Sequence, residues 1–376
     1  MAIQEIPSVD GSAATHVEPA QITSNRSNNF NLLRLLFAAM VLLAHAPELA
    51  DGDGRRELLT RVFGTLSLGE VAVAGFFLLS GCLIVQSWRR TPDLADFLKK
   101  RVLRIYPGFI AASLVSALVV GPLGAPAAHY FSQFSLPHFL KAMLLLRIPA
   151  TPPVFAGSHY PEVNGSMWTI AIEFRCYLLV AAFGVAGLLR RRGVWLALTG
   201  AALLLSLLPE VVARLHFPGG HVVLGDLNAL ARLLPFFCVG GCFALFRERI
   251  ALKPFWALLA AGALVACLFG HKTASFGLAT FGAYLLFWFA EVQSPLLARF
   301  RRLPDISYGV YLYGWPVEKL LLWYFPGSSP WLVFALACIF CAVLGLASWF
   351  GVERPFLRLK PKKSVPVPDA ALSAAS

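Results

Sequence analysis

Long apolar runs alternate with short polar stretches along most of this chain. Ten such runs occur, at about residues 31–47, 68–87, 107–124, 168–189, 194–212, 228–246, 255–270, 275–290, 306–325 and 330–351. Each is compatible with a helix that crosses a bilayer, which needs about 17–25 mostly apolar residues. The pattern predicts an all-α, polytopic transmembrane helix bundle of about ten spans.

The distribution of basic residues predicts how this bundle is oriented. If the N-terminus is cytoplasmic, 21 of the 32 Lys and Arg residues fall in inner segments and seven in outer ones. Cytoplasmic loops of membrane proteins carry such an excess of Lys and Arg. Since every second loop is basic, both termini are predicted to be cytoplasmic.

Composition excludes an ordinary soluble protein. The chain is 58% hydrophobic and 14% charged, whereas soluble domains are about 45–50% apolar and about 25% charged. The net charge of +12 does not indicate a nucleic-acid partner, because the basic residues stand in clusters between apolar runs. The seven cysteines lie inside apolar runs, so we expect no disulfide and no metal site.

Three regions follow from these patterns. Residues 1–28 are polar and aperiodic, which favours a disordered cytoplasmic tail over a signal peptide, because no basic segment precedes the first apolar run. Residues 29–356 form one ten-span membrane domain, and residues 357–376 form a basic, then flexible, cytoplasmic tail. The longest stretch between spans, 125–167, is rich in Pro, His and aromatic residues, and we expect it to fold back over the outer side of the bundle.

Two ionisable residues lie in the first predicted span. Arg34 and His45 are eleven residues apart, so they share a helix face and stand about 16 Å apart along the axis. Charged groups inside membranes usually have a function. The alternative is that Arg34 reaches lipid phosphates and His45 is an interfacial, hydrogen-bonded histidine.

A basic turn precedes the third predicted span. Arg101 and Arg104 lie on one face if the segment is helical, and Pro107 suits the start of the next helix. The pair either binds anionic lipid headgroups or holds a phosphorylated cytoplasmic cosubstrate, since arginine presents a bidentate fork to phosphate.

Further polar positions lie within the spans. Glu173 is too deep for a loop carboxylate, so it either pairs with Arg175 or Arg232 or orients an imidazole. Ser80 and Gly81 form either a packing notch between helices or a place of close ligand approach.

Six short motifs occur in a recognisable order on this ten-span frame. They are Arg34-x10-His45, the stretch from Phe77 to Ile84, Lys100-Arg101-x2-Arg104-Ile105-Tyr106-Pro107, Trp168-Thr169-x3-Glu173, Ser307-Tyr308-x2-Tyr311-Leu312 and Glu353-Arg354-Pro355. No single motif is specific. Together they resemble acyltransferase family 3, the membrane acetylases of O-antigen and exopolysaccharide.

The resemblance implies transfer of an acyl group, often acetyl, from cytoplasmic acyl-CoA to a hydroxyl of a sugar or similar acceptor. It implies that Arg34 and His45 are required for activity. Gly314 stands where some members carry a histidine, so any role of that histidine is absent here. Larger members add a C-terminal hydrolase-like domain, for which the 20-odd residues after Phe356 are too few; a separate periplasmic partner protein is an alternative source.

A mechanistic hypothesis uses the remaining positions. Arg101 and Arg104 hold the phosphates of acyl-CoA (acetyl-CoA), and Ser80 and Gly81 border its path. His45 is then either a general base, oriented by Glu173, or a covalent carrier of the acyl group. The acceptor side is assigned to three aromatic residues, Trp168, Tyr308 and Tyr311, although Tyr308 and Tyr311 equally fit an interfacial aromatic belt.

Two other classes of function are also compatible with the sequence. A proton-coupled transporter or flippase would use the same Arg, His and Glu residues, and a scaffold would use none of them. Against transport, the ionisable groups gather at the inner mouth and at one outer site, and no internal repeat is visible. We expect a multi-pass protein of a bacterial inner membrane, with membrane lipids around it and a saccharide or glycolipid as its acceptor.

Overall fold

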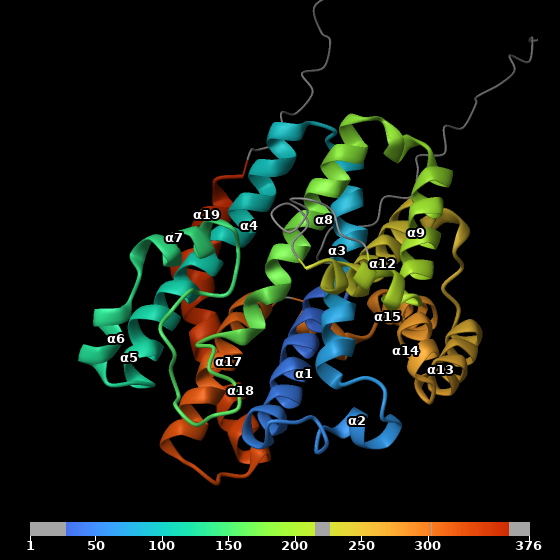
Figure 1. Ribbon diagram of the computed structural model, residues 1–376. Helices are drawn as coiled ribbons and strands as arrows, with labels where there is room; N and C mark the ends of the chain where they lie inside the picture. Colours follow the sequence, from blue (N-terminus) through green and yellow to red (C-terminus); the bar gives the residue numbers. More distant parts are fainter. Residues whose placement is uncertain (1–27, 215–225, 302, 361–376) are drawn as a thin grey trace, which may run out of the picture.

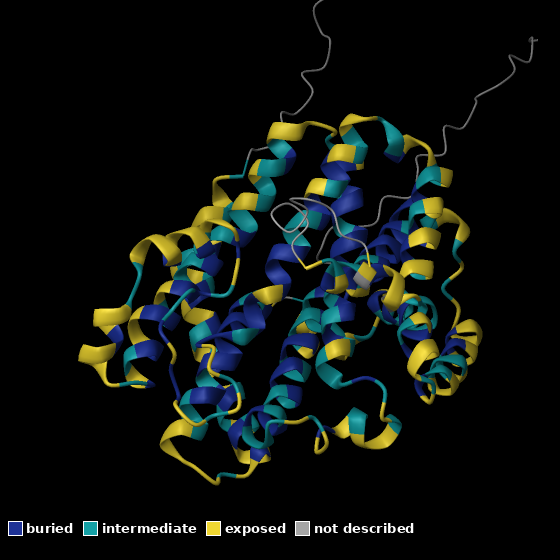
Figure 2. Cartoon of the chain, in the orientation of Figure 1, coloured by how far each residue is buried: buried dark blue, intermediate teal, exposed yellow. Residues whose placement is uncertain are grey.

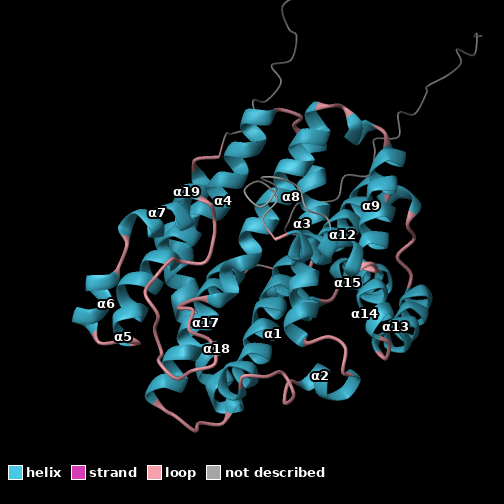
Figure 3. Cartoon of the chain, viewed as in Figure 1, coloured by secondary structure: helices cyan, strands magenta, loops and turns pink. Residues whose placement is uncertain are grey.

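The computed structural model describes residues 28–214, 226–301 and 303–360. These residues form helices and loops without a strand (Figure 3), which confirms the all-α class. The longer helices are α1 (Phe30–Asp51), α3 (Leu68–Arg90), α4 (Leu94–Val115), α8 (Trp168–Val185), α9 (Arg192–Ser206), α12 (Leu227–Leu245), α13 (Pro254–Leu268), α15 (Ala283–Glu291), α17 (Ser307–Tyr324) and α18 (Pro330–Ser348).

Short helical segments extend or connect these helices. The short α-helices are α2 (Leu58–Phe63), α5 (Gly121–Leu123), α6 (Ala127–Gln133), α7 (Leu136–Leu144), α10 (Pro209–Arg214), α14 (His271–Gly277), α16 (Pro295–Phe300) and α19 (Arg354–Arg358). Three π-helical segments are η1 (Ser116–Val120), η5 (Leu278–Gly282) and η6 (Trp349–Glu353). Three 3-10 segments are η2 (Gly165–Met167), η3 (Leu188–Arg190) and η4 (Arg247–Arg249).

Each of the ten predicted apolar runs coincides with a helix or a helical series. Among the described residues, seven of these are long and apolar enough to cross a membrane, and α9 and α13 are shorter apolar helices. The remaining one, α17, carries the buried charges Glu318 and Lys319. The polytopic helical bundle is therefore present, while the count of ten spans and the cytoplasmic termini stay predictions.

Helix α3 occupies the interior of the bundle and packs against α1, α8 and α12. Figure 2 shows this interior as the most deeply buried part of the structure. At the crossing with α12, a Cβ atom added to Gly81 would lie 1.9 Å from the carbonyl oxygen of Phe237, and one added to Gly240 would lie 2.0 Å from that of Leu78. Glycine lets two backbones meet this closely.

Helix α4 begins earlier than expected. Asp93 caps its first turn by accepting a hydrogen bond from the backbone N–H of Asp96 at 2.6 Å. The helix then runs through Pro107 rather than starting there. Arg101 and Arg104 consequently lie on a continuous helix whose N-terminal end adjoins α3 (Figure 1).

The stretch 125–167 folds back onto the bundle, as expected. Between α7 and η2 it runs without regular structure, and the stretch as a whole contacts η1, α17 and α1. Tyr130 donates a hydrogen bond to the Ala117 carbonyl at 2.7 Å, and the Asn164 side chain donates to the Leu312 carbonyl at 2.8 Å. Tyr160 donates to Glu48 at 3.1 Å.

The predicted tails 1–28 and 357–376 lie largely outside the described residues, which include only Asn28 and 357–360 of them.

The glycine contact between α3 and α12 makes a stability prediction. We expect Gly81→Ala to lower the melting temperature of the detergent-solubilised protein, because overpacking a tight contact costs about 1–3 kcal/mol. Gly262→Ala on α13 is the matched control, since no atom lies within 4 Å of its added Cβ. Equal melting temperatures for Gly81→Ala and the wild type would contradict the packing role of Gly81.

Candidate active site

A cavity of about 950 Å³ lies among α1, α3, α4, α8 and α17. Small-molecule sites in proteins typically measure about 300–1,000 Å³. Six basic side chains and two carboxylates line it: Arg34, Arg90, Arg101, Arg104, Arg301 and Lys360, with Glu173 and Asp305. The lining therefore carries a strong excess of positive charge, which we call the basic cavity.

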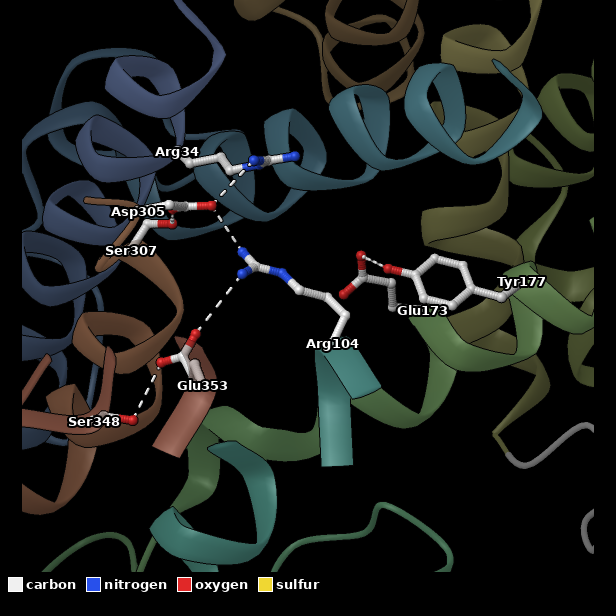
Figure 4. Close-up of polar contacts among 8 residues, drawn as sticks. All are labelled: Arg34, Arg104, Glu173, Tyr177, Asp305, Ser307, Ser348 and Glu353. Atoms are coloured by element: carbon white, nitrogen blue, oxygen red, sulfur yellow. Dashed lines mark hydrogen bonds and ion pairs between the residues drawn. The ribbon is translucent and has the colours of Figure 1, made fainter. Parts of the chain in front are cut away.

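Asp305 joins two of these arginines (Figure 4). One of its carboxylate oxygens lies 3.1 Å from Arg34 Nη1 and 2.8 Å from Arg104 Nη2, and the other accepts a hydrogen bond from Ser307 at 2.5 Å. Burial raises the pKa of Asp305, but Arg104 and Arg34 outweigh that effect and hold the pKa at about 2. The stabilisation from this ion pair is thus complete at neutral pH and is lost only as the pH falls from about 4 toward 2.

A second carboxylate approaches Arg104 from the opposite side. Glu353 lies 3.8 Å from Arg104 Nη1 and accepts a hydrogen bond from Ser348 at 3.1 Å (Figure 4). Glu353 ends the π-helical segment η6, and such segments are frequent at functional sites. The Arg104 guanidinium also lies 5.9 Å from the centre of the Tyr308 ring, so three elements fix its position.

Arg101 is held less completely than Arg104. It donates a hydrogen bond to Ser87 at 3.2 Å and lies over the rings of Phe97 and Tyr177 at 5.5 and 5.9 Å. Its buried Nε atom has no hydrogen-bond partner among the described residues. Arg101 therefore lines the cavity with one hydrogen-bond donor that has no partner among these residues.

Lys360 borders the same cavity beyond the last helix. Burial lowers the pKa of its ammonium to about 8, and the nearby Arg104, Arg101, Lys100 and Arg34 add to this effect. A bound anion would relieve that repulsion.

Glu173 bonds to two neutral side chains. It accepts a hydrogen bond from Ser80 at 2.7 Å and one from Tyr177 at 2.6 Å, the second of which is drawn in Figure 4. Arg232, one of its expected partners, instead pairs with Glu70 at 3.2 Å.

His45 has a different acidic neighbour from the one expected. Its Nδ1 atom lies 3.8 Å from Glu318, and its ring meets Trp315 edge to face at 5.0 Å. Glu318 is fully buried, and neither its two oxygens nor His45 Nδ1 has a hydrogen-bond partner among the described residues. The hypothesis that Glu173 orients His45 is therefore wrong in this structure, because Glu318 occupies that position.

Seven of the predicted site residues meet at the basic cavity: Arg34, Ser80, Arg101, Arg104, Glu173, Tyr308 and Tyr311. The hydroxyls of Tyr308 and Tyr311 donate to the carbonyls of Ile105 and Ser166, at 3.0 and 2.6 Å, so they also brace the helices.

Three predicted site residues lie elsewhere. His45 stands apart from the cavity lining, and Trp168 is 36% exposed and borders neither described cavity. Gly81 lies in the contact between α3 and α12, so of its two interpretations the packing notch fits the geometry.

Two important carboxylates, Glu318 and Asp305, were not among the predicted site residues. Glu318 carried a usable signal, because an acidic residue inside a predicted span is unusual in itself. Asp305 carried little signal, since it lies just before the span and nothing local indicates that it meets Arg34 and Arg104.

Comparison with known proteins agrees with this geometry. A model of the acyltransferase domain matches residues 27–350. The chain is 29% identical over 364 residues to the O-acetyl transferase of Shigella phage Sf6, covering 91% of this chain and 99% of that protein. It is 26% identical over 373 residues to nodulation protein 10 of Rhizobium leguminosarum bv. viciae, covering 90% and 95%. Acyltransferase MdmB of Streptomyces mycarofaciens is 24% identical over 181 residues, covering 47% and 45%.

No solved structure matches the chain. The helical bundle, its apolar spans and the match over most of the chain define an integral membrane acyltransferase. The chain belongs to acyltransferase family 3. Membership favours acyl transfer over the transporter and scaffold alternatives.

The Asp305 bridge makes a prediction about charge balance. In Asp305→Asn two arginines lose their shared counterion, and because the pair is part-buried the cost is below the about 3–5 kcal/mol of a fully buried pair. We expect a clear fall in melting temperature that added pyrophosphate partly reverses, because the anion replaces the lost carboxylate. Asp53→Asn is the control, since its ion pair with Arg55 is exposed. A variant that melts as the wild type does, with or without pyrophosphate, would rule out the bridge.

Proposed function

We propose that the protein transfers an acyl group, in the simplest case acetyl, from cytoplasmic acyl-CoA to a hydroxyl of a cell-surface or lipid-linked saccharide at a bacterial inner membrane. The observation that carries this proposal is the basic cavity, which begins at Arg34 on the same helix that presents His45 further along. The positive charge of the cavity suits the phosphates of CoA, and the imidazole of His45 suits acyl transfer to a hydroxyl.

The donor end of the proposal rests on charge. CoA carries a diphosphate and a 3′-phosphate, and guanidinium groups bind phosphate in bidentate geometry. Asp305 and Glu353 hold Arg104 in place, while Arg101 keeps an unused donor. Anion binding in the basic cavity would therefore use side chains that are already positioned.

The proposal requires the pantetheine arm of CoA to reach His45, which stands about 16 Å from Arg34 along α1. The lining of the basic cavity includes the apolar rings of Phe76 and Tyr311, which meet edge to face at 5.8 Å. The slender pantetheine arm would occupy this apolar part, and the nucleotide of CoA would occupy the charged part.

In the first chemical route, the acceptor hydroxyl oxygen attacks the thioester carbonyl carbon. His45 Nε2 takes the hydroxyl proton, the C–S bond breaks, and the proton passes to the CoA thiolate. Glu318 beside Nδ1 favours the tautomer with hydrogen on Nδ1, which leaves Nε2 free as the base.

In the second route, His45 Nε2 attacks the thioester carbonyl carbon, the C–S bond breaks and CoA leaves as a thiolate. The acceptor hydroxyl oxygen then attacks the acyl group on Nε2, the C–N bond breaks, and the hydroxyl proton passes to the CoA thiolate. Both routes require the same imidazole and the same orienting carboxylate. They differ in whether an acylated His45 forms.

Substitution of His45 tests the reaction. We expect His45→Ala to retain less than a tenth of the wild-type transfer of label from acetyl-CoA to membrane saccharides, because a general base contributes about 10²–10⁴-fold. His138→Ala on α7 is the matched control, since His138 borders neither described cavity. Activity above a tenth in His45→Ala would exclude both routes.

Two substitutions of Glu318 test the orienting role. Glu318→Gln keeps an acceptor oxygen beside Nδ1, where the Glu318 carboxylate lies at 3.8 Å, so we expect partial activity. Glu318→Leu removes that oxygen, and we expect at least a tenfold loss in the same assay. Equal activities of the two variants would show that the carboxylate does not act through the imidazole.

The pH dependence of CoA binding tests the donor site. Because the pKa of Lys360 is about 8, its charge is lost between about pH 7 and pH 9, and CoA affinity should fall several-fold over that interval. We expect Lys360→Met to bind CoA more weakly at pH 7 and to lose this dependence, measured by titration calorimetry. Lys99→Met, an exposed site on the same side, should keep it. A wild-type affinity that stays constant over this interval would contradict the assignment.

A further inference from the structure

A second, smaller cavity is lined in part by the connection between α17 and α18. Figure 1 shows this connection at the opposite end of the bundle from the α3–α4 junction. The volume of the cavity is about 420 Å³. It is bordered by the C-terminal end of α1, by part of the 125–167 stretch and by residues 326–330. We infer that this distal cavity binds the sugar ring whose hydroxyl accepts the acyl group, an inference that rests on the proposed function.

The distal cavity reaches within one helical turn of His45. Leu49 lines it, and on α1 this residue is four positions beyond His45, hence on the same face and about 6 Å further along. On α17, Glu318 lies beside His45 while the next residue, Lys319, lines the cavity. Two separate helices thus connect the histidine to the cavity wall.

A third connection runs through aromatic rings. Trp315 meets His45 at 5.0 Å and Tyr160 at 5.6 Å, both edge to face. The Tyr160 carbonyl accepts a hydrogen bond from Lys319 at 2.6 Å. Lys319 in the wall of the distal cavity is therefore linked to His45 through Tyr160 and Trp315.

Lys319 provides the buried polar group of this site. It is only 3% exposed and donates to Ser158 Oγ and to the Tyr160 carbonyl, each at 2.6 Å. An ammonium has three hydrogens, so one donor remains beyond these two bonds among the described residues. A sugar hydroxyl or ring oxygen is a suitable acceptor for it.

Aromatic side chains supply the apolar part of the site. Phe155 and Trp323 meet edge to face at 5.7 Å, and the Lys319 ammonium lies 4.8 Å from the centre of the Phe155 ring. Ligand sites combine such apolar walls with a few fixed polar groups. The C–H face of a sugar ring packs on Trp323, which is 39% exposed and is supported by Phe155, while its hydroxyls meet the polar groups.

The backbone holds Phe155 in an unusual conformation. Its φ angle is 56°, in the left-handed region that bulky residues rarely adopt, and its side chain is 1% exposed. Its N–H donates to the Gly124 carbonyl at 2.8 Å, and its carbonyl accepts from Ser158 at 2.9 Å. Non-glycine residues in the left-handed region are frequent at active sites and ligand-binding sites.

The two cavities differ in the number of charged side chains that line them. The distal cavity has two cations and one carboxylate, and Arg56 pairs there with Asp51 through two hydrogen bonds. Lys319 is the remaining cation. The basic cavity has six cations. A neutral or singly acidic sugar fits the former, and a polyphosphate fits the latter.

Steady-state kinetics with two substrates test this assignment. The acceptor probe is the glycolipid fraction extracted from native membranes, and the donor is labelled acetyl-CoA. We expect Trp323→Ala and Lys319→Met to raise the half-saturating amount of glycolipid at least tenfold and to leave that of acetyl-CoA within twofold. Trp256→Ala is the matched control, since it removes an equally large side chain that is 52% exposed on α13. Wild-type glycolipid dependence in Trp323→Ala, or a parallel change in donor dependence, would overturn the inference.

A binding measurement keeps the test independent of turnover. Ser329 borders the distal cavity and is exposed, so Ser329→Cys should react with a membrane-impermeant maleimide. We expect the glycolipid fraction to slow this labelling at least threefold, and the same fraction after periodate cleavage of its sugar diols to have no effect. Ser132→Cys on α6, also exposed, should label at one rate throughout.

The transfer assay and the labelling assay distinguish failure of the proposed reaction from failure of the proposed sugar site. If acetyl-CoA is not consumed but intact glycolipid still protects Ser329→Cys, the proposed reaction falls and the sugar site stands. If the wild type transfers label but glycolipid gives no protection, the reaction stands and the assignment of the distal cavity is overturned.

Discussion

The shared counterion at Asp305 is the interaction on which the basic cavity depends. Six cations line a space inside a helix bundle, where charges without partners are costly. Asp305 neutralises parts of both Arg34 and Arg104 and thereby ties α1 to α4 at the start of α17. Glu353, brought close by the π-helical segment η6, constrains Arg104 from the last helix. Two carboxylates thus fix the position of the arginines without cancelling the positive charge of the cavity.

Because the carboxylates neutralise only part of the positive charge, the cavity can bind an anion while the fold stays stable. The interior of the bundle is close-packed at its glycine contacts, so rigidity comes from backbone geometry at Gly81 and Gly240. The cavity itself need not be held together by full charge pairing. Arg101 and Lys360 contribute charges with weaker restraint, which leaves a ligand room to complete the coordination.

Much of the fold could be predicted from the sequence, because apolar periodicity and span length are local properties. The motif residues around Arg34, Arg101, Glu173 and Tyr308 likewise meet at one cavity, although they are far apart in the chain. The partners could not be predicted in the same way. Which carboxylate faces His45 depends on how α1 and α17 pack, and that is a property of the whole bundle. The early start of α4 was missed because Pro107 suggested a boundary that the Asp93 cap places elsewhere.

The separation of the two cavities has a consequence for the membrane itself. They share no lining residue, and His45, which has Glu318 and Trp315 as neighbours, lines neither of them. Among the described residues the two cavities therefore do not form one open channel, whereas an acyl group can pass from one bound substrate to another at His45. An enzyme built this way would export a chemical modification while leaving the bilayer electrically insulated, so the cell's proton gradient would not be dissipated by its activity.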